Sequence, residues 1–265
     1  LTAKVLKLVN SAYYSIPGGV SSLSRAIAYI GFDTVNQLVL GASILKALET
    51  KGPQRFDMNE FWKHAIGVGI ASETIAKFIN HPTSSDLFTC GLVHDMGKVA
   101  LYTIEPEAML AVVAKATESG ITYCEAETAL DICPHTKIGQ MLSSKWKLPV
   151  HIQHTVAYHH AKDTNQRGGI LPEHHRNVDI VFLRNLLSHA LKFGKSGHEK
   201  ILGAPKDVME RLGLNPESHL KPLVNDIRAN LDKAADFMRV LGGGRGLPAR
   251  RRDRGVDPGS LHQGP

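Results

Sequence analysis

Apolar residues recur at helical spacing over most of this chain. Residues 23–30 and about 57–80 each place their apolar side chains on one face, as an amphipathic helix does. Gly31 follows the first of these segments and is a residue type that often ends helices. Residues 161–175, rich in glycine and polar residues, are expected to form a long loop. The same spacing predicts further helices over residues 5–9, 84–102, 148–159, 176–193, 205–212 and 217–240.

Cap residues support this helical reading. Asp33 or Thr34 is a suitable N-terminal cap for another helix, and Pro106 and Pro134 suit the starts of two more. The β-branched run at residues 178–181 is neither bounded by turn residues nor alternating, as a half-buried strand would be. The pattern therefore predicts an all-α fold.

Composition adds limits to this picture. The chain has 265 residues, 43% of them hydrophobic, which is enough for one large or two small domains without disulfides. No segment approaches the ~18 apolar residues of a membrane span, and the residues from Leu1 onward lack the layout of a signal peptide. We therefore expect a cytoplasmic protein without a membrane span, whose three cysteines are reduced.

The net charge of +6 is concentrated at one end. Residues 242–265 hold five arginines and two aspartates, a net of +3, and their glycine, proline and arginine content predicts a disordered basic tail. The other 241 residues carry 26 basic and 23 acidic side chains and show no basic stripe with interleaved aromatic residues. We therefore do not expect a nucleic-acid partner.

Histidine is the residue type that points to chemistry. Seven of the 14 histidines lie between His135 and His175. His94 and Asp95 follow an apolar helix, where the imidazole can bind a metal ion and the carboxylate can bridge two. Lys98 lies three residues further on, where its ammonium could meet a phosphate oxygen. A helix-capping pair is the alternative explanation of an isolated His-Asp dipeptide.

Other potential ligands are spread over several predicted helices. Glu60 and His64 are four residues apart and therefore project from one helix face, although a solvated pair has the same spacing. His135 follows Pro134 at a helix start, and single buried histidines are more often satisfied core residues than ligands. The recurrence of such residues at helix ends and inner faces favours a shared metal site. The candidates are Glu60, His64, His94, Asp95, His135, His159 and His160.

Several segments, in order, resemble the HDOD domain family. Leu6–Tyr14 is similar to its "vLrlvNSayy" motif, and Ala26–Gly31 to the "Ai..lG" that follows. The motif sequence continues with Phe61–His64, Gly91–Lys98, His135–Gly139 and Trp146–Pro149 followed by His159-His160. The resemblance covers about residues 1–195. It begins inside the family pattern, so we expect the N-terminal helical part to be shortened or absent.

The resemblance implies a fold, a site and a role. HDOD domains are relatives of HD phosphohydrolases and of HD-GYP cyclic-di-GMP phosphodiesterases, so it implies an HD-superfamily-like helical bundle with an N-terminal helical subdomain in a bacterial signalling protein. By resemblance, the candidates above occupy metal-ligand positions, and Asp95 and Lys98 occupy catalytic ones. The expected parts are an N-terminal helical part (1–50), the metal-site bundle (51–200), a helical extension (201–241) and the tail (242–265).

Two departures from the superfamily pattern weaken the case for hydrolysis. The superfamily closes its site with a later Asp, whereas the matching position here is Asn185. An amide oxygen can coordinate a metal ion, but it cannot bridge ions or act as a base. The residues after His160 lack the "GYP" motif, so cleavage of cyclic di-GMP is not expected.

Two functions therefore compete. The favoured one is a regulatory signal-transduction protein that binds one or two divalent transition-metal ions, from among Fe, Mn, Ni, Co and Zn. Its partners would be signalling proteins or a nucleotide ligand. The alternative is a metal-dependent phosphohydrolase acting on a phosphoester or nucleotide. A metal-free scaffold is the remaining hypothesis.

Overall fold

The computed structural model describes residues 1–49, 55–191, 193–234 and 240, and within this part it contains helices and no strand. The all-α prediction is confirmed. The predicted tail at residues 242–265 lies outside the described residues. The helices, with one short 3-10 turn (η1), are α1 Thr2–Val9, α2 Leu23–Ile30, α3 Phe32–Ala47, α4 Met58–Phe78, α5 Ser84–Val93, α6 Met96–Ile104, α7 Pro106–Ser119, α8 Tyr123–Ala129, α9 His135–Lys145, α10 Val150–Tyr158, η1 Thr164–Gln166, α11 Pro172–Ala190, α12 Lys206–Arg211 and α13 Pro216–Lys233.

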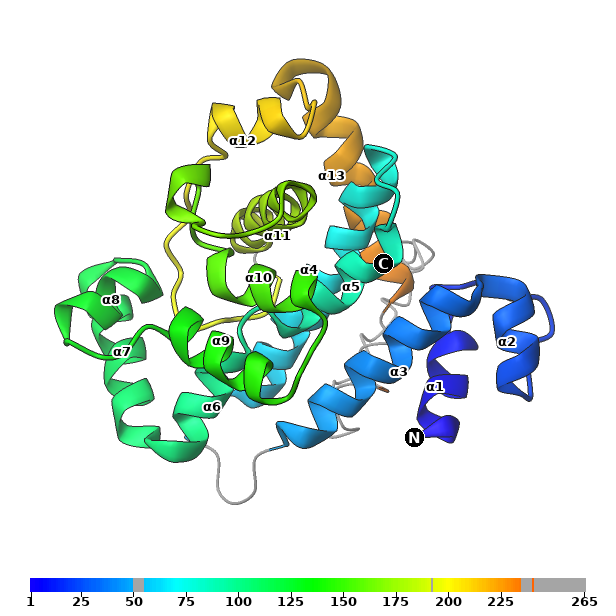
Figure 1. The fold of residues 1–265 in the computed structure, drawn as a ribbon, viewed down its shortest axis with the longest axis horizontal. Coiled ribbons are helices and arrows are strands. Elements are labelled where there is room, and N and C mark those ends of the chain that lie inside the picture. The colour runs from blue at the N-terminus through cyan, green and yellow to red at the C-terminus, as the bar shows by residue number, and fades with distance from the viewer. Residues whose placement is uncertain (50–54, 192, 235–239, 241–265) are drawn as a thin grey trace, which may run out of the picture.

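Helix α4 forms the centre of the bundle, with α5, α11 and α13 packed against it (Figure 1). Nearly every side chain of α4 from His64 to Ala76 is buried, as expected for a helix surrounded by others. Helix α10 packs on α5, α9 and α11, and α6 packs on α7 and α9. The ends of α5, α9 and α10 are thereby brought together beside α4.

The N-terminal helices α1, α2 and α3 pack on one another, and α3 joins them to the bundle through α5 (Figure 1). The Asn10 side chain fixes the turn after α1, because its amide donates to the Val20 carbonyl (2.8 Å) and accepts from the Val20 N–H (2.7 Å). The Tyr13 hydroxyl donates to Glu73 of α4 at 2.9 Å. None of the described helices is long and apolar enough to cross a membrane.

The predicted helix over residues 84–102 is interrupted. Helix α5 ends at Val93, and α6 begins at Met96. The segment just after the break is tightly packed, because a Cβ added to Gly97 would clash with the His135 carbonyl oxygen. Only glycine allows α6 to approach the start of α9 this closely. His94 and Asp95 therefore lie in a bend instead of inside a helix.

Other boundaries differ from the expected ones. Helix α11 begins at Pro172, so the predicted loop at residues 161–175 is shorter and contains the turn η1. Helix α3 is preceded by Gly31 and has no side-chain cap, so the predicted Asp33 or Thr34 cap is wrong. Helix α8 was not predicted, although Thr122 and Glu125 form a capping box at its start.

A buried carboxylate ties the loop before α11 and the helix α12 to α11. Asp179 of α11 accepts from Arg167 Nη2 at 2.6 Å and from Arg211 Nε at 2.7 Å. Asp179 and Arg167 are each 1% exposed. Removing Asp179 would therefore leave the buried Arg167 guanidinium without its carboxylate partner.

Candidate metal centre

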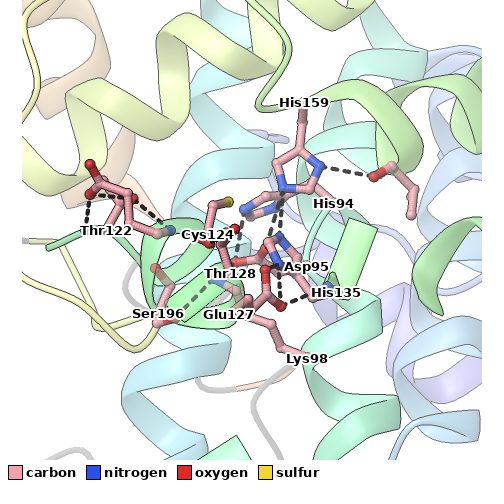
Figure 2. A network of polar contacts seen from close by, with 12 residues as sticks. His94, Asp95, Lys98, Thr122, Cys124, Glu127, Thr128, His135, His159 and Ser196 are labelled. Atoms are coloured by element: carbon pink, nitrogen blue, oxygen red, sulfur yellow. Dashed lines mark hydrogen bonds and ion pairs between the residues drawn. The ribbon is translucent and has the colours of Figure 1, made fainter. Parts of the chain in front are cut away.

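The bend between α5 and α6 is the centre of a cluster of histidines. His94 and Asp95 lie in this bend, His135 begins α9, and His159 follows the last residue of α10. His64, on α4, lies beside His94 with 5.6 Å between the ring centroids. Figure 2 shows the imidazoles of His94, His135 and His159 gathered around the Asp95 carboxylate. Side chains from four helical segments thus meet at one point.

The Asp95 carboxylate contacts all three of these imidazoles. Its Oδ1 lies 3.3 Å from His135 Nε2 and 3.4 Å from His159 Nε2. Its Oδ2 lies 3.2 Å from His94 Nε2 and 2.8 Å from Lys98 Nζ. The Nε2 atoms of His135 and His159 are 3.4 Å apart. Two nitrogens bound to one ion at about 2.0–2.1 Å lie no more than roughly 4.2 Å apart, so this spacing suits metal coordination.

The ligand atoms fall into two groups that share Asp95. One group combines Asp95 with His135, His159 and His160, and the other combines it with His64 and His94. In each group the potential ligand atoms lie within 4.8 Å of one another. Each group offers at least three potential ligand atoms, and Asp95 is the residue that both groups share.

Hydrogen bonds fix the orientation of three imidazoles. His94 Nδ1 lies 2.7 Å from the Gly91 carbonyl, and His159 Nδ1 lies 3.0 Å from the Val156 carbonyl. A carbonyl can only accept, so Nδ1 carries the proton and a neutral ring presents its Nε2 lone pair to the cluster. The His135 ring is likewise anchored through its Nδ1, in this case by the carboxylate of Glu127. The donor set therefore fits a divalent transition metal, because the inward nitrogens of His94 and His159 are available and the outward nitrogens of all three rings are anchored.

Burial and charge act on the titration of these groups. Burial raises the pKa of Asp95, but the electrostatic interactions with the His94 ring and the Lys98 ammonium, together with hydrogen bonds from His135 and His159, outweigh it, and the pKa lies well below its ordinary value. Burial lowers the pKa of His159 to about 4. Burial also lowers the pKa of His135, but hydrogen bonds to Asp95 and Glu127 reverse this to a net rise. An ionised Asp95 and a neutral His159 are in the protonation states that metal ligands require.

Lys98 is directed into the protein. Its ammonium donates to Asp95 Oδ2 at 2.8 Å and to the Ser196 carbonyl at 2.9 Å, and it lies 4.3 Å from the Tyr123 ring centroid. Its exposed fraction is 1%. The ammonium therefore stabilises the Asp95 carboxylate in this structure.

Not every candidate joins the cluster. Glu60 is absent from the groups of ligand atoms found among the described residues, and its carboxylate pairs with Lys63 at 3.1 Å on the first turn of α4. Glu60 and His64 share a helix face, but Glu60 lies about 6 Å nearer the helix start, where the side chains are partly exposed. Asn185 is buried on α11, and its role as a ligand stays a prediction.

Glu127 is a site residue that the sequence analysis missed. It is 1% exposed and lies on α8. Both of its carboxylate oxygens lie 3.0 Å from His135 Nδ1, and one accepts from the His135 backbone N–H at 2.6 Å. Cys124 lies close enough to form a third group of potential ligand atoms with Glu127 and His135. The Thr122–Glu125 capping box would have predicted the helix that carries Glu127.

Comparison with known families agrees with the motif order. The profile of the HDOD domain matches residues 1–162, more than half of the chain. The chain belongs to the HDOD domain family.

Solved structures share this fold. An HDOD domain protein of unknown function from Geobacter sulfurreducens is 23% identical, with a TM-score of 0.67 over 93% of this chain and 82% of that chain. A candidate phosphohydrolase from Shewanella amazonensis SB2B is 19% identical, with a TM-score of 0.66 over 91% and 81%. A candidate signal transduction protein from Marinobacter aquaeolei VT8 is 20% identical, with a TM-score of 0.69 over 91% and 52%.

A curated relative is longer than this chain. An uncharacterized protein from Treponema pallidum (strain Nichols) is 22% identical over 234 residues, which are 88% of this chain and 43% of that protein. The HDOD chain thus spans less than half the length of the curated relative it matches.

Proposed function

We propose that this HDOD chain is a bacterial, cytoplasmic signal-transduction protein that binds one or two divalent transition-metal ions in a regulatory role. The observation that carries this proposal is the burial of the centre. His94, His135 and His159 are 0% exposed, and Asp95 and Lys98 are 1% exposed. A centre enclosed to this degree suits a metal that links helices, whereas a phosphoester substrate would have to reach the ions. Signalling proteins or a nucleotide are the partners we propose.

The chain's own side chains would hold the metal. His135, His159 and His160 would supply nitrogen ligands on one side of Asp95, and His64 and His94 on the other. Asp95 would bridge the two groups. A bound ion would join α4, α9, α10 and the bend between α5 and α6, and would act as a Lewis acid toward a bound water. Lys98 would keep the carboxylate ionised and oriented.

A metal-dependent phosphohydrolase is the second candidate. It is favoured by the retention of Asp95 together with Lys98, and a neighbour of the same fold is named as a candidate phosphohydrolase. In this function, Asp95 would hold metal and water together, and Lys98 would stabilise charge that develops on the phosphoryl group. A movement that turns Lys98 away from Ser196 would have to open the centre first.

The test combines metal analysis with an activity screen. Protein purified without chelator is analysed for metals and assayed against phosphoesters and cyclic nucleotides with Mn, Fe or Ni added. We expect bound metal in the wild type, its loss in Asp95→Ala, its retention in the exposed control Asp226→Ala, and no turnover. Turnover that Asp95→Ala abolishes and Asp226→Ala retains would refute the regulatory proposal in favour of the enzyme. Absence of metal from the wild type would refute both.

A further inference from the structure

A segment without helical structure lies against the candidate metal centre. Within the described residues between α11 and α12 the chain forms no helix (Figure 1), and residues 193–198 are here called the cover segment. The Lys98 ammonium, which contacts Asp95, donates to the Ser196 carbonyl of this segment at 2.9 Å (Figure 2). Ser196 is 0% exposed and His198 is 8% exposed. The inner side of the cover segment is therefore part of the wall that encloses the centre.

The first half of the cover segment is held on α4. The Lys195 N–H donates to the Glu60 carbonyl at 3.0 Å. Gly194 has a φ of +69°, and a Cβ added to it would clash with the backbone nitrogen of His64, a proposed metal ligand. Only glycine combines this backbone conformation with so close an approach. The cover segment thus lies directly on the turn of α4 that carries His64.

The second half of the cover segment lies on α6 and α8. Besides the contact of Ser196 with Lys98 on α6, a Cβ added to Gly197 would lie 2.9 Å from the ring of Tyr123 on α8. The Tyr123 ring lies 5.3 Å from the His135 ring, centroid to centroid. The segment therefore bridges three helices whose side chains form or adjoin the centre.

Few interactions hold the cover segment in place. Phe193 is its only side chain that is wholly apolar, and this ring packs on Gly67 of α4. The exposed ion pair of Lys195 with Glu199 adds little, because water screens it. A segment with few buried apolar side chains and no helical hydrogen bonds opens at a lower free-energy cost than the helices around it. Opening of the cover segment therefore costs less than separating the helices of the bundle.

We propose that the cover segment opens locally while the helices stay folded, and that this opening admits and releases the metal ion of the centre. The proposal rests on the metal-binding function proposed above. The buried ligands give an ion no path in the closed structure, since His94, His135 and His159 are 0% exposed. Opening breaks the hydrogen bonds of the segment to α4 and Lys98 and leaves the ligands of α9 and α10 where they are. It therefore speeds entry and release alike and leaves the affinity for metal nearly unchanged.

The first test measures both rates by stopped flow on the full chain, with Zn²⁺ as the probe. Release is followed into an excess of a chromogenic chelator, and entry is followed on metal-free protein. Phe193→Ala removes the apolar anchor, and Gly194→Ala pushes the segment away from α4. We expect each variant to raise both rates about tenfold or more and to change the dissociation constant less than about threefold.

Matched controls lie further along the same stretch of chain. Leu202 is 41% exposed, and Gly203 has open space around it, so Leu202→Ala and Gly203→Ala should leave both rates unchanged. Rates in folded Phe193→Ala and Gly194→Ala that equal those of the controls would overturn the proposal. Faster release without faster entry would overturn it as well, because it would show that the segment supports the ligands instead of controlling access to them.

The second test needs no metal. Hydrogen exchange of the Lys195 amide, which donates to Glu60, is compared by NMR with exchange of the buried amides of α4 in the metal-free chain. We expect the Lys195 amide to be at least about a hundredfold less protected, and Phe193→Ala to reduce its protection further without affecting α4. Equal protection of Lys195 and α4 would show that the segment opens only when the whole bundle unfolds, which would overturn the proposal. A wild type that binds no metal would refute the proposed function, whereas this exchange result still decides whether the segment opens.

Discussion

The carboxylate of Glu127 offers a sharp test of the candidate metal centre. It accepts a hydrogen bond from His135 Nδ1 at 3.0 Å, and His135 Nε2 is then directed at Asp95. The substitution Glu127→Gln keeps the size of the side chain but replaces one acceptor oxygen with an N–H₂ group. The N–H₂ group cannot accept from the His135 backbone N–H or from His135 Nδ1–H, so the imidazole is held less firmly. The tautomer that leaves the Nε2 lone pair directed at Asp95 is then less strongly favoured.

The expected magnitude follows from the geometry. Removing a carboxylate that orients a metal-ligating histidine typically lowers metal affinity by about 10- to 100-fold, which corresponds to about 1.4–2.7 kcal/mol. The metal-free protein should also lose about 1–3 kcal/mol of stability, because Glu127 is 1% exposed and its hydrogen bonds are charged.

The assay is a competition titration of Zn²⁺ or Ni²⁺ against a chelator of known affinity. Denaturation of the metal-free protein with urea is measured alongside it. Glu118→Gln, an exposed substitution on α7, is the matched control and is expected to leave both quantities unchanged. A metal affinity in Glu127→Gln that equals that of the wild type would refute the conclusion that Glu127 orients a ligand, whatever happens to stability.

Three further predictions concern the packing around the site. Gly97→Ala forces a Cβ against the start of α9 and should destabilise the fold by about 1–3 kcal/mol in urea denaturation. The control Gly203→Ala, which has open space around it, should leave the stability unchanged. Equal stability of the two variants would contradict the close approach of α6 to α9. Asp179→Asn removes the charge of a buried partner of two arginines and should lower the free energy of unfolding by about 3–5 kcal/mol in the same assay. A loss below about 1 kcal/mol would contradict a stabilising role for this buried carboxylate. Burial raises the pKa of the Cys90 thiol to about 12, so the thiol is protonated at pH 8 and should resist a thiol-disulfide reagent until the protein unfolds. The exposed Cys133 should react at once. Equal labelling rates of the two cysteines would contradict the burial of Cys90.

Local sequence signals identified most of the helices. The helix predicted over residues 23–30 matches α2, because its apolar face and the following Gly31 are both local features. The break at His94 and Asp95 has no such local signal, because the apolar spacing continues from α5 into α6. Just after the break, Gly97 packs against His135, which lies almost forty residues away in the sequence. Sequence spacing cannot reveal an interhelical contact of this kind.

The candidate site was predictable only in part, because motif order can be read from the sequence but the depth of a side chain in the bundle cannot. Motif order pointed to His94, Asp95, His135 and His159, and the structure brings these four side chains together. The carboxylate that anchors His135 belongs to Glu127 on α8, and the sequence signal for this helix is its capping box, Thr122 and Glu125. Glu60 illustrates the opposite error, because a shared helix face does not place two side chains at the same depth in the bundle.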